Sequence, residues 1–528
     1  WEGGGSYTNI GPGYCATNAH FNKTDCAAAH SGQWTTTQTS ANGTGATFDI
    51  TTDSDGDVVT FTVNNPGYGY LSDDELTFRD PGNTSNTAVV IVNATLSETD
   101  RQVAIGYNAG YDLTYGVGNT LLGNEAGQNL TTGDNNIAIG SNALNTEDTG
   151  SDNIAIGNNA LKDLNYDGGG NNVAVGYNSL HNTTTGTYNV SIGNKALSTN
   201  TDTSYNVALG HSALYTASAG YNVGIGYQAG WANTTGTSNF FLGYRSGYDT
   251  TTSSDNVYIG KEAGRYKATG SSGSGRNTAI GSSCFRNGET DATTDNTAYE
   301  NVVIGYNAMS GSLGTTTDHC TANQNVLIGV KAGYVNLSGN HNVGIGDEAL
   351  YNLTTGDDNI AIGSSALNTE DTGSKSIAIG YEALKAQDYD GDSGNIGIGY
   401  QAGLSNTSGI GNVYTGLYAG RYVTTGTRNI FIGRGAGQGV VGNKLTGSSN
   451  VAIGDYAGSA LQAGAAQNHF IGDGAGQSVT TGWQNFAIGR HSLDAEVAGN
   501  RSVAIGNAAL TNATQGTNTQ VENTAIGY

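Results

Sequence analysis

Residues 131–157 decide the fold, and their sequence is TTGDNNIAIGSNALNTEDTGSDNIAIG. This stretch contains the motif N-x-A-I-G twice, and the motif glycines Gly140 and Gly157 lie 17 residues apart. The motif, usually continued as x-x-A-L or x-x-A-G, recurs 24 times between Gly106 and Gly527, and longer spacings of 19, 21 and 24 residues add residues only between motifs. A unit this short cannot enclose its own core, so the repeats predict a solenoid in which each coil packs against its neighbours.

The alternation within one repeat predicts a β-strand. In the letters NIAIG, Ile137 and Ile139 share one side of the strand and Ala138 takes the other. The glycine that follows is expected to end the strand where the chain turns. We expect Ala143 and Leu144 to return apolar atoms to the interior as a second short strand.

A column of asparagines opens the motifs and is expected to stack from coil to coil. Side-chain amides stacked in register can form hydrogen-bonded ladders. A ligand site lined by asparagine is the alternative, and we favour the ladder because it explains every copy equally well. Examples are Asn136, Asn172, Asn206, Asn222 and Asn342.

A block of several repeats is itself duplicated, which indicates an elongated protein. Residues 131–157 return as residues 354–380 with only four differences, at an offset of 223 residues. At about 4.8 Å per coil, the stacked repeats would form a rod on the order of 115 Å long. The predicted fold class is therefore all-β: a β-solenoid, or β-roll, of about 24 coils with a 17-residue basic period, preceded by a small β-rich N-terminal domain.

Residues 1–98 lack the repeat, and the chain divides into three predicted regions. Residues 1–36 form a cysteine-loop module, residues 37–98 a small β domain with alternating pattern and a Pro-Gly turn, and residues 99–528 the repeat shaft. Cys15 and Cys26 lie close together in the first region. We favour a disulfide-closed loop, typical of oxidising surroundings, over a pair of reduced thiols.

The composition excludes several classes of protein. The chain has 83 Gly but only 3 Pro, without the every-third glycine of collagen, and its 36% of apolar residues and 30 Tyr disfavour a disordered chain. A formal charge of -24 with only 20 Lys and Arg argues against a nucleic-acid partner. No stretch approaches the roughly 20 apolar residues of a membrane span.

Two acidic turns are weak calcium candidates. DSDGD and DYDGD each place three carboxylates at alternate positions, and carboxylate oxygens are ligands for Ca²⁺. Neither completes an EF-hand loop, and a solvated acidic turn is the favoured interpretation. We therefore expect no cofactor, with calcium as the alternative. The six candidate ligands are Asp53, Asp55, Asp57, Asp388, Asp390 and Asp392.

No grouping of residues predicts an enzyme. The eight His residues show no zinc-ligand spacing, and no Ser, His and acid set stands out from a composition rich in Ser, Thr and Asp. Carboxylates suited to glycan cleavage cannot be paired from sequence, so a glycan-cleaving β-helix stays a remote alternative. Cys284 and Cys320 lie in the longest repeats, where they form either a disulfide or two free thiols.

The motif N-x-A-I-G-x-x-A is similar to the repeat of the left-handed β-roll heads of trimeric autotransporter adhesins. The runs NNIAIGSNAL and ENTAIGY resemble the repeat shafts of bacteriophage tail fibres and related virion adhesins. In the N-terminal region, NNPGYGYLSDDELTF resembles a β module of phage virion proteins, and the segment with Cys15, Cys26 and Trp34 resembles a cysteine-loop module found beside it. Both resemblances imply a homotrimeric extracellular fibre that attaches to a cell surface.

The function predicted from these observations is structural. We expect a rigid shaft at the virion surface or outside the cell that associates with itself as a homotrimer or filament, with a host cell-surface glycan or protein as a further partner. The alternative is a cell-surface adhesin or an extracellular filament subunit of a bacterium or eukaryote. Adhesion follows from the resemblance alone, whereas the shaft also follows from the repeats.

Overall fold

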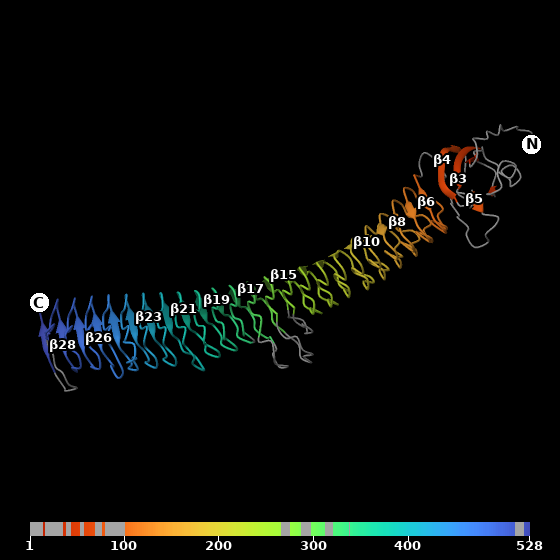
Figure 1. Ribbon diagram of the computed structural model, residues 1–528. Coiled ribbons are helices and arrows are strands. Elements are labelled where there is room, and N and C mark those ends of the chain that lie inside the picture. The colour runs from red at the N-terminus through yellow and green to blue at the C-terminus, as the bar shows by residue number, and fades with distance from the viewer. Residues whose placement is uncertain are drawn as a thin grey trace, which may run out of the picture. The chain divides into compact units, whose positions relative to one another are not determined.

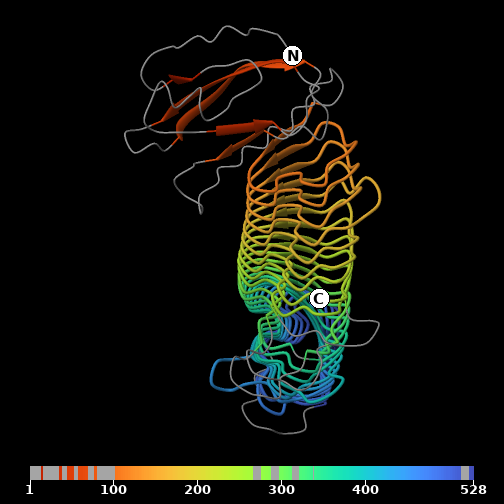
Figure 2. The same ribbon diagram turned by 90° about the vertical axis from the view of Figure 1, so that its right-hand side faces the viewer.

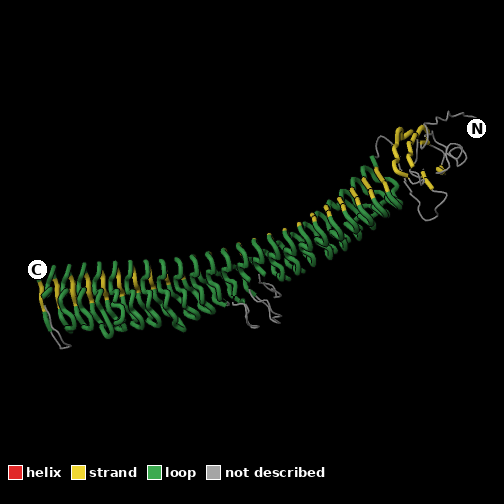
Figure 3. Tube along the Cα trace, viewed as in Figure 1, coloured by secondary structure: helices red, strands yellow, loops and turns green. Residues whose placement is uncertain are grey.

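The computed structural model describes residues 101–265, 275–286, 297–311, 320–336, 338–512 and 522–528, and before residue 101 the backbone of five strands. Every described element is a β-strand, and the described residues contain no helix. Figure 3 shows short strands joined by loops and turns that make up most of each coil. The chain divides into two compact units, Trp1–Thr235 and Gly236–Tyr528.

The five N-terminal strands pair antiparallel. β1 pairs with β3 and β3 with β4, while β2 pairs with β5. One strand of the predicted cysteine-loop module therefore joins a sheet with two strands of the predicted β domain. The division of residues 1–98 into two regions stays a prediction. The bounds are β1 Tyr14–Cys15, β2 Thr35–Gln38, β3 Thr44–Thr52, β4 Val58–Tyr68 and β5 Leu76–Arg79.

The first unit continues as a parallel ladder of eight three-residue strands. Each strand pairs residue for residue with the next, so that Ala138 lies opposite Ala155. Figure 2 shows these coils lying over one another. Their bounds are β6 Val103–Ile105, β7 Thr120–Leu122, β8 Ile137–Ile139, β9 Ile154–Ile156, β10 Val173–Val175, β11 Val190–Ile192, β12 Val207–Leu209 and β13 Val223–Ile225.

The second unit repeats the pattern sixteen times, and several of its strands are labelled along the ladder in Figure 1. The register survives the longest insertions, because Tyr258 lies opposite Ala279 and Ala279 opposite Val303. The bounds are β14 Phe240–Leu242, β15 Val257–Ile259, β16 Thr278–Ile280, β17 Val302–Ile304, β18 Val326–Ile328, β19 Val343–Ile345, β20 Ile360–Ile362, β21 Ile377–Ile379, β22 Ile396–Ile398, β23 Val413–Thr415, β24 Ile430–Ile432, β25 Val451–Ile453, β26 His469–Ile471, β27 Phe486–Ile488, β28 Val503–Ile505 and β29 Thr524–Ile526. The predicted solenoid of about 24 coils with a 17-residue basic period is confirmed.

Hydrogen bonds join the coils around most of their circumference, not only at the strands. The amide of Ile137 donates to the carbonyl of Asn153 in the next coil (2.8 Å), whereas Gly140 donates to Leu122 in the preceding one (2.7 Å). In the turn, Leu144 donates to Ala160 (3.0 Å). Each coil is therefore held on both sides by backbone groups that would otherwise be buried without partners.

The predicted asparagine ladder is present, and it does two things. The backbone amide of Asn153 donates to the side-chain oxygen of Asn136 in the preceding coil (3.0 Å). The Asn136 side-chain nitrogen donates to the carbonyl of Gly150 in its own coil (2.8 Å). One buried side chain thus connects two coils and also ties the start of its coil to the end. Asparagine suits this position because its amide carries both an acceptor and a donor.

The interior lies on the alanine side of the strand. Ala138 is fully buried, whereas Ile137 and Ile139 on the opposite side are only half-buried. Ala143 and Leu144 are also fully buried, as predicted, but they form a turn. The prediction of a second short strand there was wrong, because Leu144 adopts a left-handed conformation with φ of 51°.

Two interior positions compensate each other in size. When the central strand residue is Ala, the residue six positions later is Leu in pairs such as Ala138 with Leu144 and Ala361 with Leu367. When it is large, the later residue is Gly, because the two side chains compete for one space. The pairs with glycine are Leu121 with Gly127, Phe241 with Gly247, Tyr258 with Gly264, Leu327 with Gly333, Tyr414 with Gly420, Phe431 with Gly437 and Phe470 with Gly476.

The motif glycine is required by both conformation and space. Gly140 has φ of +133°, which side-chain-bearing residues rarely adopt, and a Cβ there would lie 2.5 Å from the carbonyl oxygen of Gly157. Gly157 stands in the same relation to Gly176 in the next coil. The glycine column therefore sets how closely the coils approach one another.

Candidate functional site

The outer face of the strands is an apolar surface in each unit. We call the first and third residues of every repeat strand the strand face. Of its members, Val103 and Ile105 are 47% and 46% exposed in the first unit, and Ile398 and Ile432 are 37% and 38% exposed in the second. None of the strand-face residues from β6 to β29 is Asp, Glu, Lys or Arg. Exposed apolar surfaces of this extent mark interaction sites in soluble proteins.

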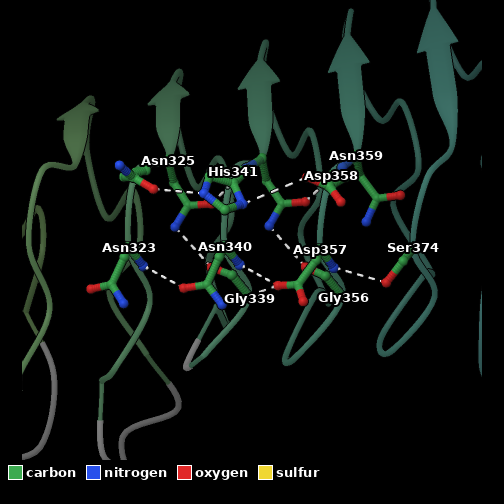
Figure 4. Close-up of polar contacts among 12 residues, drawn as sticks. Asn323, Asn325, Gly339, Asn340, His341, Gly356, Asp357, Asp358, Asn359 and Ser374 are labelled. Carbon is green, nitrogen blue, oxygen red and sulfur yellow. Dashed lines mark hydrogen bonds and ion pairs between the residues drawn. The ribbon is translucent and has the colours of Figure 1, made fainter.

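The corner before the strand carries a second polar ladder that sequence analysis missed. The amide of Asn323 donates to the side-chain oxygen of Asn340 (2.9 Å), and Asn340 donates in the same way to Asp357 (2.6 Å). Asp357 then donates to the hydroxyl of Ser374 (2.9 Å). Figure 4 shows this row beside the buried asparagine ladder. Two polar rows, one buried and one half-buried, therefore hold the coils in register.

Ionisable side chains next to this row lie beside one another on successive coils. The His341 ring lies 3.6 Å from a carboxylate oxygen of Asp358, as Figure 4 shows, and Lys375 lies 2.5 Å from Asp392. Ion pairs at the surface contribute about 0–1 kcal/mol each.

Three carboxylates gather at one corner of the second unit. Oxygens of Glu370, Asp371 and Asp388 lie within 4.8 Å of one another. Glu370 is buried and accepts hydrogen bonds from the amide of Gly373 (2.7 Å) and the side chain of Gln387 (2.9 Å). One Asp371 oxygen is enclosed without a hydrogen-bond partner among the described residues. This acidic corner is the grouping closest to a metal site in the described chain.

Burial raises the pKa of several of these carboxyl groups. Enclosure in the interior raises the pKa of Glu370, although the hydrogen bonds from Gln387 and Gly373 oppose the rise. Partial burial, followed by the neighbouring carboxylate of Asp371, raises the pKa of Asp388. Glu147 is the counterpart of Glu370 in the first unit, and burial raises its pKa as well.

The predicted calcium ligands do not gather as the sequence suggested. Asp388 faces Asp371, but Asp390 accepts a hydrogen bond from Thr372 (2.7 Å) and Asp392 pairs with Lys375. The three carboxylates of DYDGD therefore each contact a different residue of the preceding coil, and they do not converge on one point. The other three candidates, Asp53, Asp55 and Asp57, lie outside the described residues.

The cysteines of the long repeats form no disulfide. Cys284 and Cys320 are both buried thiols outside any disulfide, so the disulfide alternative was wrong and the alternative of two thiols holds. The Cys284 thiol donates to the carbonyl of Val303 (3.0 Å), and burial raises its pKa to about 12. A protonated, enclosed thiol fills space and is not reactive. The side chain of Cys15 and all of Cys26 lie outside the described residues, and their pairing stays a prediction.

Aromatic side chains stack along the outer surface. Tyr188, Tyr205 and Tyr221 form a column with ring centroids 5.1 and 5.0 Å apart. Tyr381 and Tyr400 stack in the same way, 5.1 Å apart. Stacked pairs contribute about 0.5–1.5 kcal/mol beyond their burial. The columns therefore stabilise the surface, and they also expose ring edges and hydroxyl groups to a partner.

Comparisons with protein families, with curated proteins and with solved structures gave no match. The described residues include no helix that is both long and apolar enough to span a bilayer. The class that the fold defines is a parallel β-solenoid repeat protein.

Sequence reasoning missed the acidic corner although the signal was present. Glu370 and Asp371 stand in one repeat and Asp388 in the next, 17 residues after Asp371. In a solenoid with this period, residues 17 apart lie side by side on successive coils. Searching for ligands across one coil spacing, and not within one loop, would have found the group.

Proposed function

We propose that this chain is the shaft of an extracellular or virion-borne fibre, and that its role is to hold attached parts at a distance. The observation that carries the proposal is the unchanged strand register. Insertions at Gly260–Gly281 and Gly281–Gly305 lengthen the connecting segments but leave β15, β16 and β17 paired residue for residue. Each coil contacts its neighbours alone, so adding coils adds length without altering the core.

The strand face supports self-association of the shaft. The second unit has sixteen strands with two outward residues each. At roughly 40 Å² of exposed side chain per residue, they offer on the order of 1,300 Å², above the ~800 Å² that each partner contributes to a standard interface. A second copy of the same chain supplies a matching uncharged face, and the excess negative charge then remains on the outer surfaces. A homotrimer or filament built on this face is the proposed assembly.

Electron microscopy and light scattering test the proposal on the purified chain. The shaft requires particles with a contour on the order of 115 Å, from about 4.8 Å per coil. The homotrimer requires a mass near three times the 53.9 kDa of one chain. Compact particles would overturn the shaft, whereas rods with the mass of one chain would overturn the self-association alone.

A pair of substitutions assigns the interface. Ile398→Asp with Ile432→Asp places two charges on the strand face, and we expect the assembly to dissociate. Asp358→Asn is the control, because it changes a charge at an exposed position that is not a strand-face residue. Dissociation by the control variant, or an unchanged mass for the double variant, would refute the strand face as the interface.

A further inference from the structure

We propose that the side-chain cluster of Tyr381, Tyr400, Tyr418, Arg421 and Tyr422 binds an anionic saccharide, one that carries a carboxylate or sulfate group. This site goes beyond the shaft, which needs no ligand to fulfil its role. We refer to these five residues as the tyrosine–arginine cluster.

The cluster is continuous across three coils. Tyr381 stacks on Tyr400 with ring centroids 5.1 Å apart, and Tyr400 meets Tyr418 edge to face at 5.5 Å. The Arg421 guanidinium carbon lies 4.5 Å from the ring centre of Tyr418 and 5.0 Å from that of Tyr422. Two rings therefore hold one cation at the end of an aromatic row.

Arg421 differs from the paired arginines of the same unit. Arg434 donates from Nε to Asp455 (2.8 Å), and Arg276 lies 2.9 Å from Glu300. Among the described residues, the Arg421 guanidinium has no hydrogen bond or ion pair, and its Nε is enclosed without a partner. The nearest acid on the row of Tyr418, Glu382, is already held by Lys385 (2.6 Å). The cation is positioned but not neutralised.

The chemistry of the cluster fits a charged sugar better than other anions. A guanidinium stacked on aromatic rings offers paired donors to a carboxylate or sulfate. Tyr381 and Tyr400 are 45% and 43% exposed, and a tyrosine presents both apolar ring surface and a hydroxyl. A saccharide has matching C–H faces and hydroxyl groups. Nucleic acid is a poor fit, because a single arginine on a chain of charge -24 cannot compensate a phosphate backbone.

Three probes with a common core separate the contributions: 3′-sialyllactose, lactose 3′-sulfate and uncharged lactose. We would titrate each into the full chain and follow it by saturation-transfer NMR. One anionic contact with ring stacking should give a Kd on the order of 1 mM. We expect lactose to bind about tenfold more weakly, which corresponds to one charge-assisted contact. The two anionic probes distinguish carboxylate from sulfate recognition.

Arg421→Met removes the charge but keeps an unbranched apolar side chain, and we expect it to weaken anionic binding about tenfold. Arg434→Met is the matched control and should leave the affinity unchanged, because that charge is already paired with Asp455. If circular dichroism shows Arg421→Met to be misfolded, Tyr400→Ala at the exposed edge provides the second test and should weaken binding several-fold.

Three results would overturn the proposal: equal binding of all three probes, no saturation transfer from the anionic probes, or equal losses in Arg421→Met and Arg434→Met. None of them bears on rod length or mass. A failure of this site is therefore distinguishable from a failure of the proposed shaft.

Discussion

The size compensation inside the solenoid predicts a rescue by double substitution. Phe431 fills the interior of its coil, and Gly437 leaves room for the ring because a Cβ there would lie 2.4 Å from Phe431 Cγ. We expect Phe431→Ala and Gly437→Leu each to destabilise this coil. Together they recreate the pair formed by Ala138 and Leu144, and most of the loss should be recovered.

The structure sets the magnitudes. Phe431→Ala removes a fully buried ring and should cost about 3–5 kcal/mol of unfolding free energy. Gly437→Leu should cost about 1–3 kcal/mol through overpacking and about 1 kcal/mol more through its left-handed backbone. Gly437 has φ of +52°, close to the 51° of Leu144, so the double variant retains that backbone cost and a residual cavity, about 2 kcal/mol in total. The coupling energy, which is the sum of the two single losses minus the loss in the double variant, should therefore be about 3–7 kcal/mol in favour of the pair.

Hydrogen exchange measured by mass spectrometry suits a repeat protein, because a solenoid need not unfold in one step. Peptides that cover β24 and β25 report the local opening free energy of the four proteins in the cycle. Gly394→Leu isolates the backbone cost, since Gly394 has φ of +58° and no atom within 4 Å of an added Cβ. Additive losses in the double variant would refute the shared interior space.

Three further predictions concern the coil framework. Gly140→Ala should abolish hydrogen-exchange protection in β8 and β9, because its Cβ would lie 2.5 Å from the carbonyl oxygen of Gly157. Gly394→Asn, the control, should leave the exchange protection of its own coil intact, because a Cβ there has no atom within 4 Å. Equal losses of protection in the two variants would refute the close approach of the coils. Asn342→Asp should lower the local opening free energy by about 2–4 kcal/mol, because it places a buried carboxylate against the carbonyl of Gly356. Asn342→Ser should lower it by less, because Ser376 occupies the ladder position in another coil of the natural chain. A larger loss in Asn342→Ser than in Asn342→Asp would contradict the donor role of the asparagine. The thermal midpoint should rise as the pH is lowered toward the ordinary pKa of a glutamate, because burial raises the pKa of Glu147 and of Glu370. The stability that these groups give is full below their ordinary pKa and is lost as the pH rises through the folded pKa. A midpoint that falls as the pH is lowered toward that ordinary value would refute the prediction.

The period and the strands could be predicted because they depend on local pattern. Glycine at a fixed spacing and alternation within NIAIG are properties of neighbouring residues. The direction of the interior could not be predicted in the same way, since Ile–Ala–Ile alternates equally well with either side buried. The size compensation between the strand centre and the later Leu or Gly was visible in the repeats and would have shown that Ala138 faces inward.

The candidate sites were harder to predict because they depend on neighbouring coils. Asp388 lies close to Asp371 only because successive coils stack on one another. Arg421 lies over the ring of Tyr418 because of the shape of the turn that carries both residues. Leu144 offers no sequence signal for a left-handed backbone, so its turn resembled a strand. Cys284 and Cys320 illustrate the limit of spacing, because closeness in adjacent repeats did not bring the sulfurs into a bond.

The central claim is that successive repeats advance along one axis by a constant step. Spin labels at positions 358, 428 and 501 test it, because all three residues precede the ladder position before a strand and have φ of 56–60°. Four coils separate Asp358 from Arg428 and eight separate it from Arg501, so pulsed electron resonance should give distances of about 19 and about 38 Å. A longer distance that is about twice the shorter one supports the solenoid. Two similar distances, or a 358–501 distance below about 25 Å, would contradict it.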